Sequence, residues 1–192
     1  WGLIFAWRLE VWKQAVASEL PHWLTVWYEL EALSALAGYG WLNPQTTFPH
    51  VHDDETAPVL QVQGIGHPLL PNDRKVRNDF TVNTLGEVAI LTGSNMSGKS
   101  TLLKALGVNL ALAYAGSVVD VQTLHTLRFR LFTCIKVSDS VTDGISYFYA
   151  EVQRLRALLD ALTLTADLPL FFAIDEIFRG TNNRERLIGS RS

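Results

Sequence analysis

The sequence is poor in cysteine, in long apolar runs and in basic charge. Its single cysteine, Cys134, excludes a disulfide within the chain, fits a reducing, cytoplasmic location and lies in an apolar run that predicts burial. No apolar run reaches the roughly 18 residues of a transmembrane helix, so no membrane partner is expected. The 16 Lys and Arg against 19 Asp and Glu give a net charge of −3. A general basic field is thereby excluded, so any DNA contact must be local or made by other parts of the protein.

Tryptophan is unevenly distributed. All six tryptophans fall within residues 1–41 of the 192, which predicts a helical element over 1–42 and a main domain over 43–192. Apolar residues at helical spacing, with Pro21 starting a second helix, predict two helices here. They would pack on each other or on the next domain, or lie on a membrane surface; the few flanking Lys and Arg favour packing. The chain starts without Met and inside a helix, so we expect a fragment of a longer protein.

The motif that organises the main domain is G-x-x-x-x-G-K-S. Val88–Leu91 is expected to form a buried strand before it, and a helix is expected over 99–114. This context disfavours a chance glycine turn and predicts a phosphate-binding loop, in which backbone N–H groups and the helix N-terminus surround the phosphates. Lys99 would reach the β- and γ-phosphates and the Ser100 hydroxyl would hold Mg²⁺. The motif residues are Gly93, Ser94, Asn95, Met96, Ser97, Gly98, Lys99 and Ser100.

A second motif closes the predicted domain. The apolar run 170–174, which follows Pro169, predicts a strand that ends in Asp175-Glu176. Asp175 would hold Mg²⁺ and Glu176 would polarise the attacking water. Acidic residues often end strands, but after a phosphate-binding loop this pair predicts ATP hydrolysis.

Weaker signals complete the prediction. Strands are expected over 59–62, 79–85 and 128–137, and a helix over 146–162 with an apolar stripe of Phe148, Val152, Leu155 and Leu159. Ser146, at the start of that helix, could bind an anion or be an ordinary N-cap, and local sequence does not separate the two. The run from His50 to Asp54 suggests a metal site, but a solvated loop is favoured because no matching ligand pair exists elsewhere.

Four segments together resemble the MutS family of DNA mismatch-recognition ATPases. Thr92–Thr101 resembles its Walker A segment, including the Asn95-Met96 pair, and 175–182 resembles its Walker B segment with the following Arg-Gly-Thr. The segment 146–151 resembles its ABC-type signature, and Gly66-His67-Pro68 the stretch before the ATPase core.

The resemblance implies an α/β fold, an ABC-type P-loop NTPase sheet flanked by helices, with a small helical element in front. It implies ATP or ADP and Mg²⁺ as ligands, with residues 93–101, Thr101 included, around the nucleotide. Asn95, Lys99, Ser100, Asp175 and Glu176 would act on the bound nucleotide, and Ser146 on that of a partner subunit in a homodimer or MutS-like heterodimer. The expected function is ATP turnover coupled to a conformational clamp on duplex DNA in mismatch repair.

Three departures from the family pattern stand out. Ser94 replaces a proline, Tyr147 replaces a threonine, and the position of the adenine-stacking aromatic falls near Lys75 or Val76. The family's switch histidine and C-terminal dimerisation helices would lie beyond Ser192, so this chain alone is expected to hydrolyse ATP poorly. The alternatives are an SMC-like or other DNA-repair ABC ATPase, and a nucleotide-gated interaction module with little turnover.

Overall fold

A computed structural model describes residues 1–53, 58–94, 97–135 and 147–175, with the side chains of 147–151 left out. The chain divides into two compact units, Trp1–Pro44 and Gln45–Ser192. None of the helices in these described ranges is long and apolar enough to span a membrane.

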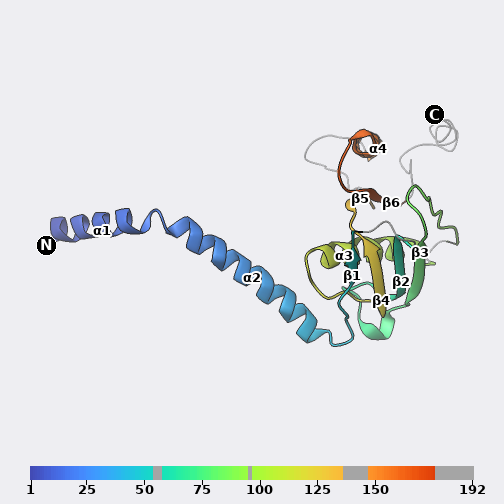
Figure 1. Cartoon of the computed structure of the whole chain (residues 1–192), viewed down its shortest axis with the longest axis horizontal. Coiled ribbons are helices and arrows are strands. Elements are labelled where there is room, and N and C mark those ends of the chain that lie inside the picture. Colours follow the sequence, from blue (N-terminus) through green and yellow to red (C-terminus); the bar gives the residue numbers. More distant parts are fainter. Residues whose placement is uncertain (54–57, 95–96, 136–146, 176–192) are drawn as a thin grey trace. The chain divides into compact units, whose positions relative to one another are not determined.

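The first unit consists of helices α1 (Gly2–Val16) and α2 (Leu20–Leu42) (Figure 1). As predicted, Pro21 lies in the first turn of α2, where a missing N–H breaks no helical hydrogen bond. Neither helix contains a buried residue, so the prediction that they pack on each other is wrong. The apolar residues occur on all sides of each helix, which leaves no single stripe for a partner to cover.

The second unit contains a four-stranded mixed sheet in the order β1-β4-β2-β3. The strands are β1 (His50–His52), β2 (Leu60–Ile65), β3 (Asn78–Val82) and β4 (Thr123–Leu127), and a short 3₁₀ helix η1 (Asn72–Arg74) precedes β3. β1 runs parallel to β4, and the other neighbours are antiparallel. The strands predicted over 59–62 and 79–85 are confirmed as β2 and β3 with shifted ends. The segment 43–57 was expected to be a loop or an edge segment, and its described part contains β1, which lies at the edge of the sheet. Strand β4 was not predicted.

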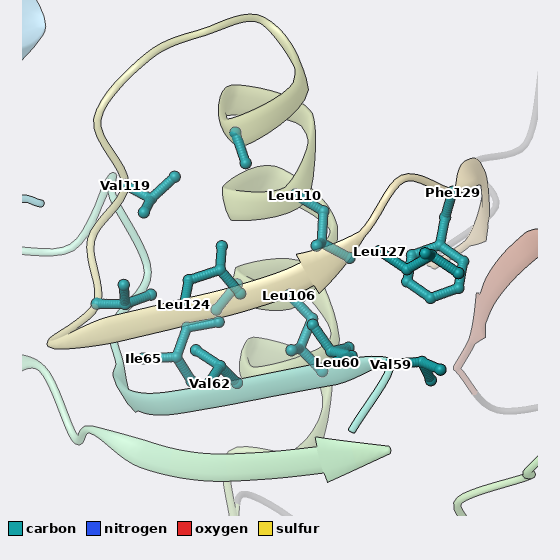
Figure 2. Close-up of a cluster of buried hydrophobic side chains, with 13 residues drawn as sticks. Val59, Leu60, Val62, Ile65, Leu106, Leu110, Val119, Leu124, Leu127 and Phe129 are labelled. Carbon is teal, nitrogen blue, oxygen red and sulfur yellow. The ribbon is translucent and has the colours of Figure 1, made fainter. Parts of the chain in front are cut away.

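Helix α3 (Lys99–Tyr114) covers one face of this sheet and has the predicted bounds. Leu106 and Leu110, at most 2% exposed, face Leu60, Val62 and Leu124 of the sheet (Figure 2). Burial of such side chains stabilises the fold by roughly 1.5–3 kcal/mol each. The helix that begins at the phosphate-binding motif is thus anchored by its middle turns in the main hydrophobic core.

A separate pair of parallel strands carries the second motif. These are β5 (Arg130–Cys134) and β6 (Leu170–Ile174), joined through α4 (Tyr147–Thr163). The β6 strand, the helix and the burial of Cys134 agree with the predictions. On α4, however, Leu158 is buried and Leu159 is 61% exposed, so the predicted stripe is wrong. Successive side chains of a helix point about 100° apart around its axis, so the neighbouring residues Leu158 and Leu159 face different sides.

The segment Val88–Leu91 is not a strand, which corrects the context predicted for the motif. Val88 is 65% and Ile90 82% exposed. None of the described strand pairings includes these residues, and an apolar run becomes a buried strand only when neighbours complete its ladder. The Glu87 carboxylate instead accepts the Asn83 N–H at 2.7 Å in the turn that leads out of β3.

Candidate nucleotide-binding site

The phosphate-binding motif forms a turn that leads directly into α3. Gly98 has φ 88°, in the left-handed region, and is the N-cap of the helix; Gly93 has φ 155°. A side chain at Gly98 would be strained, which explains why the last position before the lysine needs glycine. The first N–H groups of a helix have no partner within it and favour an anion. Asn95 and Met96 lie outside the described residues.

Lys99 occupies the centre of this turn. Its Nζ donates hydrogen bonds to the carbonyl oxygens of Gly93 at 2.8 Å and Ser94 at 2.7 Å, and to Ser97 Oγ at 3.3 Å. The ammonium group therefore contacts the loop's own acceptors. A bound phosphate would compete for the same ammonium with negatively charged oxygens, which form stronger hydrogen bonds than neutral carbonyls.

A cavity of ≈ 620 Å³ lies against this turn. Its volume suits a ligand of small-molecule size. One wall, here called the phosphate-side wall, is formed by the motif and the start of α3. The motif residues on it are Gly93, Ser94, Ser97, Gly98, Lys99 and Thr101.

A second group of lining residues comes from the segment between β2 and β3 and from the first residue of β3, and is here called the base-side wall. It includes the histidine of the Gly-His-Pro segment. Its members are His67, Leu70, Arg74, Lys75, Val76 and Asn78. Two segments that are separate in sequence thus share one cavity. The residues predicted the first as a phosphate-binding loop, and the family resemblance pointed to the second through the adenine-stacking position near Lys75 or Val76.

The two positions considered for the adenine-stacking residue behave differently. Lys75 donates a 2.6 Å hydrogen bond to Asp120 Oδ2, and its side chain is 3% exposed. Val76 is 80% exposed and lines the cavity. Val76 is therefore the side chain at this position that a ligand can meet, and it offers a small apolar surface in place of an aromatic ring.

His67 lies on the same wall, and its lowered pKa favours the neutral form of its imidazole. Burial, followed by the nearby positive charges of Lys104 and Lys75, lowers the pKa of His67 from its ordinary value, against a smaller opposing effect of Asp120. Its Nδ1 accepts the Leu69 N–H at 3.2 Å, which assigns the ring proton to Nε2. The imidazole can thus donate one hydrogen bond from Nε2 without bringing a charge.

Two further predicted site residues, Ser100 and Asp175, are not brought to this cavity. Both are described but do not line it. Asp175 follows β6, and its N–H donates to the Cys134 carbonyl oxygen at 3.0 Å, which continues the β5–β6 ladder. Glu176 and Ser146 lie outside the described residues. Within those ranges, no group of three His, Cys, Asp or Glu side chains could hold a metal ion.

Sequence reasoning missed Asp120, the buried partner of Lys75. A signal was present, because Asp120 interrupts the apolar run Ser117–Val121, and a charged residue that becomes buried in such a run requires a partner. The identity of that partner depends on the fold, since Lys75 lies 45 positions earlier.

Comparisons with known proteins agree with the resemblance. The profile of MutS domain V matches residues 89–188. The chain is 32% identical over 139 residues to the DNA mismatch repair protein MutS of Fusobacterium nucleatum, covering 70% of this chain and 15% of that protein. It is 33% identical over 189 residues to the DNA mismatch repair protein MutS 2 of Halobacterium salinarum, covering 94% and 20%. It is 34% identical over 164 residues to MutS of Symbiobacterium thermophilum, covering 80% and 17%.

The chain thus spans between 15% and 20% of the length of these three relatives. The matched range contains both the phosphate-binding loop and the Asp175-Glu176 pair. The chain belongs to the MutS domain V family, whose members are P-loop ATPase domains.

Proposed function

We propose that this chain binds and hydrolyses ATP as the ATPase domain of a MutS-like DNA mismatch repair protein. The observation that carries the proposal is the ≈ 620 Å³ cavity between the phosphate-side wall and the base-side wall. A nucleotide needs cationic and N–H groups at one end and an apolar surface at the other. Lys99 with the start of α3 supplies the first, and Val76 with Leu70 the second.

In the proposed mode of binding the triphosphate displaces the loop carbonyls from Lys99. The ammonium then contacts phosphate oxygens, and the N–H groups at the start of α3 surround them. The base lies towards Val76, and the neutral His67 donates a hydrogen bond from Nε2 to the nucleotide. Both ends of the ligand are thus bound by described residues.

The proposed hydrolysis uses the residues after β6. The Glu176 carboxylate would orient the attacking water and accept its proton as the bond from the water oxygen to the γ-phosphorus forms. The bond from that phosphorus to the β–γ bridging oxygen breaks in the same step, and ADP leaves with the electron pair. The Ser100 hydroxyl and the Asp175 carboxylate are hard oxygen donors of the kind that Mg²⁺ accepts alongside phosphates and water. When bound there, Mg²⁺ would neutralise part of the phosphate charge.

The fold and assembly proposed for the intact protein follow the family resemblance. The sheet would be completed in the manner of an ABC-type ATPase, and Ser146 of a second MutS-like subunit would contact the γ-phosphate. The helices of residues 1–42 would connect the ATPase to DNA-binding parts, so that ATP turnover drives a clamp on duplex DNA. The net charge of −3 agrees with DNA contacts that are made by other regions of the protein.

Steady-state ATP turnover of the full-length protein, alone and with matched or mismatched duplex DNA, tests this function. We expect turnover that DNA changes, with mismatched DNA acting at a lower concentration than matched DNA. ATP binding with no turnover under any condition would favour a nucleotide-gated interaction module. Turnover that neither duplex alters would show that ATP hydrolysis is not coupled to DNA.

A further inference from the structure

A buried carboxylate organises the base-side wall. Asp120 is 1% exposed, and each of its oxygens accepts one cationic donor: Oδ2 from Lys75 Nζ at 2.6 Å and Oδ1 from Arg77 Nη2 at 2.7 Å. The Lys75 side chain is 3% and the Arg77 side chain 29% exposed. A charge this deeply buried is stable only when it is paired and hydrogen-bonded, so the three side chains form one unit.

The same residue is tied to the helix of the phosphate-binding motif. Asn109 of α3, itself 1% exposed, accepts the Asp120 N–H on Oδ1 at 2.7 Å. Its Nδ2 donates to the carbonyl oxygens of Gly66 at 3.0 Å and Ala105 at 2.8 Å. The backbone of Asp120 is therefore held by α3, the helix that begins at the phosphate-side wall of the cavity.

The Gly64–Gly66 segment closes the network. The Gly66 N–H donates to the Asp120 carbonyl oxygen at 2.8 Å, and Arg77 Nη1 donates to the Gly64 carbonyl oxygen at 2.8 Å. A Cβ on Gly66 would approach Asp120 Oδ2 to 2.9 Å, so this close approach requires glycine. The backbone that leads into His67 is thereby held against the ion cluster.

The ion cluster affects the orientation of Val76, which lies between Lys75 and Arg77 in the sequence. Lys75 has an extended backbone with φ −77° and ψ 123°, and successive side chains of extended chain point in opposite directions. Because Lys75 and Arg77 both reach Asp120, Val76 is turned away from it, and Val76 is 80% exposed on the cavity wall. The ion cluster thus sets which side chain of this segment meets a ligand.

We propose that Asp120 is a positioning residue for nucleotide-base recognition, which acts by holding Lys75 and Arg77 so that Val76 faces the base. The inference rests on the proposed function, because it takes the ligand of the cavity to be a nucleotide. Without the Asp120 charge, Lys75 and Arg77 lose their common partner and Val76 loses its fixed orientation. The phosphate-side wall, which has its own contacts through Lys99, is left intact.

The test compares ATP with inorganic tripolyphosphate, both with Mg²⁺, by calorimetry on the full chain. Tripolyphosphate has neither base nor ribose, so the ratio of the two dissociation constants measures what the nucleoside adds to binding, and a change in that ratio on mutation of the base-side wall reports on the nucleoside end of the ligand. Asp120→Asn is expected to weaken ATP binding roughly tenfold, equivalent to loss of about one good contact, while tripolyphosphate binding stays the same. Asp53→Asn is the matched control, because it makes the same change at a side chain that is 73% exposed.

A double-mutant cycle with Val76→Ala separates positioning from general damage. If Asp120 acts through Val76, Asp120→Asn has no further effect on the ATP to tripolyphosphate ratio once Val76 is truncated. If Asp120→Asn does not fold, Arg77→Met replaces it. This variant retains the buried Lys75–Asp120 pair and removes only the Arg77 guanidinium, which belongs to a side chain that is 29% exposed. It is expected to change the same ratio in the same direction, by less.

Three results would overturn the inference. An equal loss for both ligands would show a structural role only, and additive effects of Asp120→Asn and Val76→Ala would show that the two residues act separately. An unchanged ratio in both Asp120→Asn and Arg77→Met would show that the cluster does not influence the base. If the unmodified chain bound neither ligand, the proposed function itself would fail, which is a distinguishable outcome.

Discussion

The two walls of the cavity are held in different ways. The base-side wall is fastened by buried groups, with Asp120 and Asn109 each 1% exposed and connected to three segments of chain. The phosphate-side wall is a turn whose glycines are exposed, and the Lys99 ammonium donates hydrogen bonds to two carbonyl oxygens of its described part. Exposed hydrogen bonds contribute less to stability than buried ones that leave unpaired groups when broken. The difference indicates a base-side wall formed before the ligand arrives and a phosphate-side wall that rearranges on binding.

The largest effect is expected in the chemical step of ATP hydrolysis. Glu176→Gln should lower the ATP turnover of the full-length protein by roughly 10²–10⁴-fold, because an amide cannot act as a general base. Nucleotide affinity should stay the same, since the amide preserves the shape of the side chain. Steady-state turnover and calorimetry check the two statements, with Glu31→Gln on the exposed surface of α2 as the control. Turnover that survives in Glu176→Gln would assign the base to another residue.

The next largest effect is expected in the free energy of unfolding, which should fall more for a variant of the base-side network than for one of the phosphate-side wall. Asn109→Ala leaves the Asp120 N–H and the Gly66 carbonyl without their buried partner, at about 1–3 kcal/mol for each orphaned group. Lys99→Ala removes contacts at an exposed turn, and we expect a change below about 1 kcal/mol. Urea unfolding of both variants measures this, with Asn83→Ala at an exposed position as control. Equal losses for Asn109→Ala and Lys99→Ala would contradict the contrast between the walls.

Ligand affinity should depend strongly on Lys99 of the phosphate-side wall, although this residue contributes little to the free energy of unfolding. Lys99→Ala is expected to weaken ATP and tripolyphosphate together, by roughly 10–100-fold, because a hydrogen bond to a charged group contributes about 1.5–3 kcal/mol. Lys13→Ala is the control, since it makes the same change at a side chain of α1 that is 59% exposed. Calorimetry with both ligands is the measurement. A loss confined to ATP would place Lys99 near the base and reverse the assignment of the walls.

The smallest effect concerns pH. Because the pKa of His67 is lowered in the folded chain, the unfolded chain binds the extra proton first as pH falls. His67 therefore lowers stability as pH falls through its ordinary value of 6.5, and the loss is complete below the folded pKa. His67→Gln should be less sensitive to pH between 5 and 7.5 in urea unfolding. A steeper pH dependence in His67→Gln than in the unmodified chain would show that the shift has the opposite sign.

The sequence predicted those parts of the site that depend on neighbouring residues. Helix α3 and strand β6 have their predicted bounds because local features delimit them, namely Gly98 before the helix and Pro169 before the strand. The roles of the motif residues rest on chemistry that belongs to the motif alone, and they stay predictions.

What the sequence could not predict depends on pairing between distant segments. Strands β1 and β4 exist through their mutual ladder, in which His50 lies opposite His125. The apolar segment Val88–Leu91 had the composition of a strand but has no strand partner in the described pairings. The base-side wall follows the same rule, because Val76 faces the cavity through a residue 44 positions away from it in sequence.

Methyl NMR of the isotopically labelled full chain tests the placement of the nucleotide between the two walls most directly. The Val76 methyl resonances and the Gly98 amide resonance would be followed during titration with Mg-ATP and with Mg-tripolyphosphate. We predict that Gly98 shifts with both ligands, while Val76 shifts with ATP alone because only ATP carries an aromatic base. Val76 resonances that do not respond to saturating ATP would contradict the placement of the base on this wall.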